Sequence, residues 1–167
     1  DIGGDYMKIK KYTTKLDANK HNSLDEVSCT EVTDRDMKYP AEIAAALNEA
    51  YDLEHMAEEY LYMVGFSIAG NVLGVFEVSH GVVSQSIASP REIFIRALLS
   101  GAAYIVLVHN HPSGSTDPSE GDFALVRRIY DSGRLMCVPL IDNIIIGEDG
   151  AYFSFREEHM MPNQKTH

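Results

Sequence analysis

The sequence predicts an α/β fold in which a mixed β-sheet is flanked by helices. Two observations carry this prediction. The run Tyr104 to Val108 is apolar throughout and lies between a helix stop and a polar loop, which is typical of a strand buried on both faces. Tyr60 to Ile68 is rich in aromatic and β-branched residues and turns back through Ala69-Gly70-Asn71 into Val72 to Val78, the pattern of an antiparallel hairpin.

The first 39 residues are expected to form an N-terminal extension of strand and loop. Met7 to Leu16 alternates polar and apolar residues as a strand does, and Val27 to Val32 is a candidate for a second, short strand. A polar loop from Asp17 to Ser23 separates them. The main domain is expected to span residues 40–158, and residues 159–167 a C-terminal tail.

The first predicted helix begins at Pro40, because proline is well tolerated in the first turn of a helix. The apolar residues that follow recur at helical spacing: Ile43, Ala44, Leu47, Ala50, Tyr51 and Leu53. After the hairpin of residues 60–78, the segment Val82 to Ile87 is expected to be extended again.

A second predicted helix has clear start and stop signals. Ser89 is a natural N-cap, Pro90 takes the first helical position, and Glu92 follows the serine at the spacing of a capping box. Gly101 ends this helix, and the buried strand from Tyr104 comes directly after it.

The last part of the chain is predicted to contain one more helix and a β-rich end. The helix begins at Ser119. Strands are expected over Val138 to Ile141, Asn143 to Ile146 and Ala151 to Phe155, with Glu148-Asp149-Gly150 as a hairpin turn.

Composition narrows the possible functions. A net charge of −11 argues against binding along nucleic-acid backbones, which needs clustered lysine and arginine. The chain has no apolar run near the ~20 residues of a membrane span, and its first residues do not resemble a signal peptide. Cys29 and Cys137 lie far apart without metal-binding spacing, so we expect two buried or half-buried free thiols and a cytoplasmic protein.

The segment that follows the buried strand carries the chemistry. His109 and His111 are two residues apart, so on extended backbone both imidazoles face the same way. The next seven residues contain two prolines and a glycine, which turn the chain back to a helix start at Ser119. Asp122 lies on the first turn of that helix and can project over the end of the strand. Two histidines and one carboxylate leave a fourth tetrahedral position open for water, as catalytic zinc sites do.

Each of these residues also has a purely structural interpretation. An isolated His-x-His occurs by chance in many chains, and Ser119 with Asp122 is a capping box in its own right. The combination of a buried strand, a restricted loop and a capped acid favours the metal site. The remaining histidines show no partner spacing and are expected on the surface or in loops: His21, His55, His80, His159 and His167.

At these residues the sequence resembles a known family. His109-x-His111, seven residues, Ser119, two residues and Asp122 resemble the signature of the JAMM (MPN+, JAB) metalloproteases. The run His109 to Gly114 with Pro118-Ser119 is similar to the bacterial RadC branch in particular. The start of the second helix at Ser89 to Phe94 and the strands near the C-terminus also resemble that branch, so the resemblance covers residues 40–158.

The resemblance implies a cytidine-deaminase-like JAB/MPN fold, one zinc per chain and hydrolysis of peptide or isopeptide bonds. His109, His111 and Asp122 would be the ligands, and Ser119 would stabilise the oxyanion. The family's catalytic glutamate precedes the histidines by several dozen residues at the start of a core strand. Glu59 fits that place best, with Glu77 and Glu92 as rivals.

The chain departs from the branch in two ways. Asp142-Asn143 stands where the branch usually has Asp-His, and residues 1–40 show no helix-hairpin-helix region. We therefore expect a stand-alone JAB domain with a peptide or isopeptide-linked protein as substrate, no nucleic-acid or membrane partner, and strand edges that permit a homodimer. The alternatives are a non-catalytic MPN-type interaction module, which would hold no metal, and a DNA-repair-associated accessory protein, which would bind DNA in a salt-sensitive way.

Overall fold

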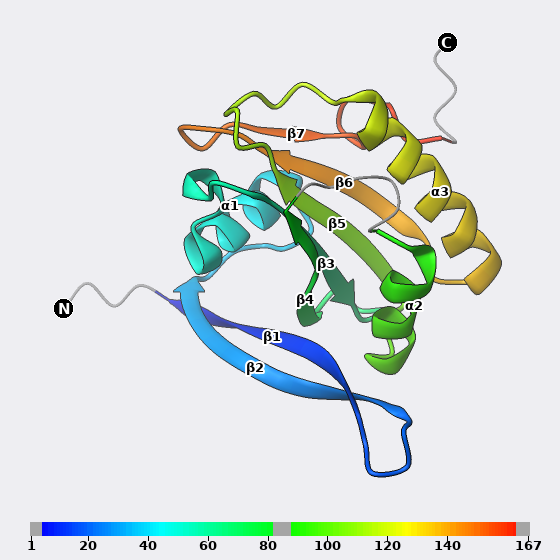
Figure 1. Ribbon diagram of the computed structural model, residues 1–167. Helices are drawn as coiled ribbons and strands as arrows, with labels where there is room; N and C mark the ends of the chain where they lie inside the picture. The colour runs from blue at the N-terminus through cyan, green and yellow to red at the C-terminus, as the bar shows by residue number, and fades with distance from the viewer. Residues whose placement is uncertain (1–4, 82–87, 163–167) are drawn as a thin grey trace.

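In the computed structural model, which describes residues 5–81 and 88–162, seven strands form one mixed sheet (Figure 1). The strands are β1 (Tyr6–Leu16), β2 (Asn22–Thr33), β3 (Glu59–Phe66), β4 (Val72–Gly81), β5 (Tyr104–Asn110), β6 (Leu140–Ile146) and β7 (Tyr152–Ser154). Their order across the sheet is β2-β1-β4-β3-β5-β6-β7. The pairs β1/β4 and β5/β6 are parallel and the others are antiparallel, so the predicted mixed sheet is confirmed.

Helices cover both faces of the sheet. Helix α1 (Pro40–Tyr51) packs on one face, followed by the short 3-10 helix η1 (Leu53–His55), while α2 (Pro90–Leu99) and α3 (Glu120–Met136) pack on the other (Figure 1). Each face has its own core, with Ile43 and Leu47 of α1 in one and Ile93 of α2 and Ile129 of α3 in the other. None of the helices in the described part of the chain is both long enough and apolar enough to cross a membrane.

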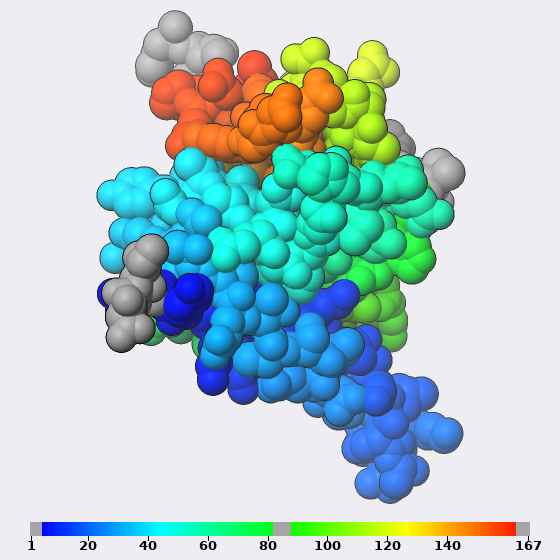
Figure 2. All heavy atoms as spheres, turned by 90° about the vertical axis from the view of Figure 1, so that its left-hand side faces the viewer, coloured from blue at the N-terminus to red at the C-terminus, as the bar shows by residue number. Residues whose placement is uncertain are grey.

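The N-terminal residues form a long hairpin that joins the sheet. Strands β1 and β2 pair along their whole length, and β1 pairs with β4 at Lys11 with Val75 and Tyr12 with Phe76. Ile9 and Val32 are buried in the core on the α1 side. The tip of the hairpin, in blue, projects away from the rest of the molecule in Figure 2.

Several element predictions need correction. Strand β2 is longer than the expected Val27 to Val32, and the two strands expected at residues 138–146 are the single strand β6. Both cysteines are free but exposed, because Cys29 lies on the edge strand β2 and Cys137 caps the end of α3. The extended segment expected at Val82 to Ile87 lies outside the described residues.

The capping box predicted for α2 is also wrong. Ser89 occupies the N-cap position but its side chain makes no capping hydrogen bond. The Glu92 carboxylate lies 2.8 Å from Arg91 Nη1 and 3.3 Å from Arg96 Nη1 instead. The Glu92 carboxylate therefore pairs with two guanidinium groups in place of the N-cap backbone N–H.

Candidate metal centre

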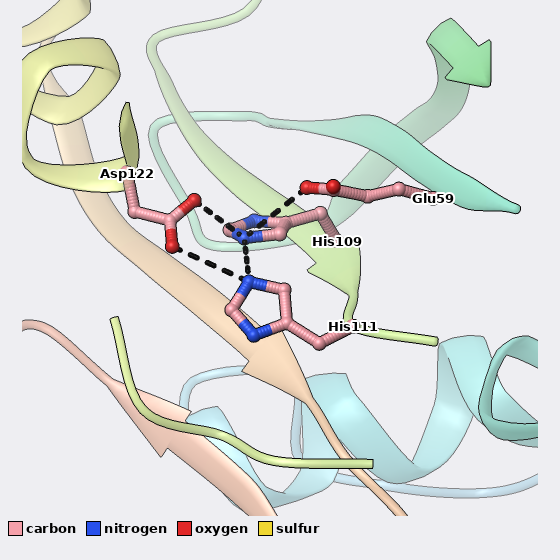
Figure 3. A group of neighbouring side chains, drawn as sticks. All are labelled: Glu59, His109, His111 and Asp122. Atoms are coloured by element: carbon pink, nitrogen blue, oxygen red, sulfur yellow. Dashed lines mark hydrogen bonds and ion pairs between the residues drawn. The ribbon is translucent and has the colours of Figure 1, made fainter. Parts of the chain in front are cut away.

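The two histidines of the predicted site lie at the end of the central strand β5. His109 is the next-to-last residue of β5, and its side chain is 1% exposed. His111 is the first residue after the strand, and its backbone N–H donates to the carbonyl of Ile146 on β6. Extended backbone continues through both residues, so the rings point to the same region (Figure 3).

Asp122 faces these rings from the first turn of α3. The predicted capping box is present here: Ser119 Oγ accepts from the Asp122 backbone N–H at 3.1 Å, and Asp122 Oδ2 accepts from the Ser119 backbone N–H at 2.7 Å. Ser119 Oγ also donates to Asp122 Oδ2 at 2.8 Å. The buried carboxylate is therefore held in place by the same contacts that begin the helix.

The three groups are spaced as ligands of one ion would be. His109 Nε2 lies 3.0 Å from Asp122 Oδ1, and His111 Nε2 lies 3.3 Å from Asp122 Oδ2. The two Nε2 atoms are 3.2 Å apart. Ligand atoms bound at 2.0–2.2 Å to a tetrahedral zinc lie about 3.4 Å from one another, so all three separations fit a common metal.

The hydrogen bonding of His111 provides a second test of this fit. Its Nδ1 lies 3.0 Å from the backbone carbonyl of Ser115, which can only accept, so Nδ1 carries the proton. In a neutral ring, Nε2 then presents a lone pair toward the Asp122 carboxylate. Two acceptors that face each other in this way are stabilised by a cation between them, and histidine ligands commonly hold their other nitrogen by such a bond.

Glu59 completes a group of four side chains. It is the first residue of β3, and its Oε1 lies 3.9 Å from His109 Nε2, farther than the three closer groups lie from one another (Figure 3). The ligand atoms of Glu59, His109, His111 and Asp122 all lie within 4.8 Å of one another. Glu59 therefore belongs to the cluster but stands farther from His109 than Asp122 and His111 do.

The two rival glutamates lie elsewhere in the structure. Glu77 of β4 is 2.9 Å from Lys11 Nζ and 3.0 Å from His80 Nδ1. Glu92 forms ion pairs with the arginines of α2 described above. Neither belongs to the group of four, so Glu59 is the one of the three that the fold brings to the histidines.

Asn110, which the sequence interpretation missed, fixes the backbone around Glu59. The Asn110 side chain, 1% exposed, accepts from the Tyr60 backbone N–H at 2.7 Å and donates to the Glu58 carbonyl at 3.0 Å. These two hydrogen bonds fix the backbone on both sides of Glu59. The available signal was a polar residue at the end of a buried strand, on the face opposite the two histidines.

The cluster shifts the ionisation of its carboxylates in opposite directions. Burial raises the pKa of Glu59, and the neighbouring histidines offset this only in part. Burial also raises the pKa of Asp122, but its interactions with the nearby imidazoles of His109 and His111 outweigh that effect and hold the pKa well below its usual range. Asp122 thus stays charged at lower pH than an ordinary aspartate, whereas Glu59 takes up a proton more readily than an ordinary glutamate.

A cavity of about 350 Å³ opens beside the cluster. Its wall contains Glu59, His111 and Asp122, together with Ser113, Ser115 and Asp117 of the loop before α3 and the apolar Ala88 and Leu125. Within the described residues, no lysine or arginine lines it. The described part of the lining therefore offers carboxylates, hydroxyl groups, an imidazole and apolar surface to a ligand, but no lysine or arginine.

Comparisons with known proteins agree on one family. A family model described as RadC-like JAB domain matches residues 37–160 of this chain. The UPF0758 protein of Pelobacter propionicus is 39% identical over 111 residues, 66% of this chain and 48% of that protein. The UPF0758 protein of Clostridium acetobutylicum is 37% identical over 122 residues, 73% of this chain and 52% of that protein. The chain spans about half the length of these curated relatives, whose names state no activity.

Proposed function

This chain belongs to the RadC-like JAB domain family, and on that premise we propose that it is a zinc-dependent hydrolase that cleaves amide bonds in peptides or isopeptide-linked proteins. The observation that carries the proposal is the convergence of His109, His111 and Asp122 on one point beside Glu59 and an open cavity. The family membership and the donor set support a metal hydrolase; the choice of zinc and of the substrate is the proposal.

His109, His111 and Asp122 would hold the zinc through two nitrogens and one oxygen. When bound, such an ion acidifies a water molecule and polarises a carbonyl group. Three protein ligands fit a catalytic role, because structural zinc sites close all four positions with protein.

Glu59 would act as general base and then as general acid. Its carboxylate is half-buried, and its raised pKa suits a group that takes a proton from the attacking water and returns it to the departing amine. Asn110 would hold that carboxylate in place through its two contacts with the flanking backbone.

Ser119 would donate a hydrogen bond to the developing oxyanion. In the structure its hydroxyl proton is directed at Asp122 Oδ2, so this role requires the hydroxyl to turn toward the substrate oxygen. The Ser119 backbone N–H would continue to hold Asp122 Oδ2 during that rotation.

The lining of the cavity supports an uncharged amide as the reacting group. Terminal carboxylates and phosphates are recognised by arginine and lysine, and none of the described residues that line the cavity is an arginine or a lysine. An internal peptide bond or an isopeptide bond therefore fits this cavity better than a C-terminal residue or a phosphate ester.

Metal analysis together with two variants tests the proposal. Purified wild-type protein is expected to hold one zinc per chain and to hydrolyse members of a library of peptides and isopeptide conjugates. His109→Ala should lose both metal and activity, whereas Glu59→Gln should keep the metal and lose activity by ~10²-fold or more, because a positioned base contributes about that much. Protein that holds no metal after zinc loading would support an interaction module instead.

A further inference from the structure

Two buried polar groups near the metal centre have no hydrogen-bond partner among the described residues. One is Nδ1 of His109, and the other is the carboxamide of Asn143, of which both Oδ1 and Nδ2 are unsatisfied. Asn143 is 0% exposed and His109 is 1% exposed. Buried polar groups in folded proteins nearly always have partners, so this pair calls for an explanation.

Strand register puts the two side chains on the same face of the sheet. In the parallel pair β5/β6, Leu107 lies beside Asn143 and His109 lies beside Ile145. Leu107 and Ile145 both belong to the core on the α2 and α3 side, so His109 and Asn143 point into that layer as diagonal neighbours. Diagonal neighbours on adjacent strands are ~7–8 Å apart, a gap across which one water can bridge two polar side chains that are not in direct contact.

The surroundings of His109 Nδ1 favour Asn143 as its partner. The other two residues at these paired positions, Leu107 and Ile145, are apolar and offer no hydrogen-bond partner. The neighbouring buried polar residue of β6, Asp142, lies beside Val106 of the α1-side core and so points to the opposite face of the sheet. Its carboxylate already accepts hydrogen bonds from Ser154 Oγ at 2.6 Å and from the Arg156 backbone N–H at 3.0 Å. Asn143 thus supplies a free acceptor on the correct face.

We infer that Asn143 is a positioning residue of the metal centre, whose Oδ1 accepts the Nδ1 proton of His109 through one buried water. This inference rests on the proposed zinc site. When His109 Nε2 serves as a ligand, Nδ1 carries the proton, and an acceptor there fixes both the tautomer and the plane of the ring. His111 is held in the same way by the Ser115 carbonyl, so each ligand histidine then has an acceptor of its own.

The substitution Asn143→Leu separates this role from ordinary packing, because leucine has the same branching at Cγ and no polar atoms. Zinc affinity, measured by competition with a chromophoric chelator, is expected to fall by about 10–100-fold, the usual effect of losing such a partner. The thermal midpoint of the metal-free variant is expected to be equal to that of wild type or higher, because an unsatisfied buried amide has been removed. A residue with only a packing role would not move the two measurements in opposite directions.

Two further variants serve as controls. Asn143→Asp keeps an acceptor in place and should retain the wild-type zinc affinity. Ile145→Val alters packing directly beside His109 without changing a polar atom, and should also bind zinc as wild type does. The visible spectrum of the cobalt-loaded protein should change in Asn143→Leu alone, since only that variant frees the His109 ring.

The inference is overturned if Asn143→Leu binds zinc as tightly as wild type, or if Ile145→Val loses as much affinity. A measurement on the wild-type protein is independent of how the variants fold: the Nδ1 proton of His109 in the zinc-loaded form should exchange slowly in NMR spectra, and exchange at the rate of a free imidazole would contradict the inference. Wild-type protein that binds no zinc would refute the proposed function itself.

Discussion

The two carboxylate oxygens of Asp122 have different partners. Oδ2 accepts hydrogen bonds from both the backbone N–H and the hydroxyl of Ser119, whereas Oδ1 lies 3.0 Å from His109 Nε2. A contact that normally serves only to begin a helix therefore also orients a candidate metal ligand. Loss of the serine hydroxyl should affect both the stability of α3 and the metal site.

Ser119→Ala is expected to lower the free energy of unfolding by about 1 kcal/mol, the usual cost of removing an N-cap side chain. Zinc affinity should fall by about tenfold, since the carboxylate loses one of the bonds that orient it. Chemical denaturation and chelator competition measure the two effects. Ser89→Ala is the matched control, because Ser89 is the N-cap of α2 without a side-chain capping bond and should change neither quantity. Equal effects of the two substitutions would contradict this account.

At the residue scale, sequence patterns identified the groups whose geometry is local. His109 and His111 share a direction because strand side chains alternate, and Asp122 follows from the spacing of a capping box. Glu59 and Asn110 depend on the pairing of β3 with β5, which joins positions 50 residues apart. No local pattern encodes that pairing, so three glutamates remained possible until the sheet was known.

At the element scale, the N-terminal hairpin has a narrow attachment to the rest of the sheet. Strand β1 meets β4 in two residue pairs, and beside them Lys11 Nζ lies 2.9 Å from the Glu77 carboxylate. Burial raises the pKa of Glu77, but hydrogen bonds from Lys11 and His80 outweigh it and hold that pKa below its ordinary value of 4.5. This ion pair should therefore stabilise the attachment of the hairpin in a pH-dependent way.

A lowered pKa in the folded state stabilises the protein above the unfolded-state pKa, and the stabilisation is lost as the pH falls through the folded-state value. Glu77→Gln should thus reduce the free energy of unfolding at pH 7 by about 1 kcal/mol or less, and the difference from wild type should vanish toward pH 3. Thermal melts of the metal-free proteins between pH 7 and pH 3 measure it. Glu31→Gln, in the exposed pair with Lys8, is the control and should change little at any pH. A difference that persists at pH 3 would count against this explanation.

Helices and strands with a clear hydrophobic pattern or capping signal were predicted well. Strands whose length or register depends on pairing with a neighbouring strand were not. The apolar run that became β5 and the capped start of α3 are recognisable by themselves. Strand β6 carries Asp142 and Asn143 in the middle of an apolar segment, and its register shifts there relative to β5, so the sequence suggested two short strands. Strand β2 is an edge strand with many polar residues, and its length comes from pairing with β1.

At the scale of the whole molecule, the candidate metal centre lies where three distant segments meet. The start of β3, the end of β5 and the start of α3 each contribute side chains, and the buried apolar residues of the two cores include none of these four. A domain with two complete cores should fold without metal, unlike a zinc finger, whose folding depends on the ion. Zinc should then act as a ligand that adds stability to an already folded state.

That expectation gives a quantitative test. Free zinc at 100 times its dissociation constant should add about 2.7 kcal/mol to the free energy of unfolding, which raises the melting temperature of a domain of this size by about 5–10 °C. Magnesium should give no such shift, because it prefers oxygen ligands in octahedral geometry. His109→Ala should melt at the same temperature with and without zinc, since two of the three proposed ligands hold the ion poorly. Calorimetry with and without each metal measures these melting temperatures. Equal shifts with zinc and magnesium would point to nonspecific binding by an acidic chain. A metal-free protein without a melting transition would assign the zinc a structural role.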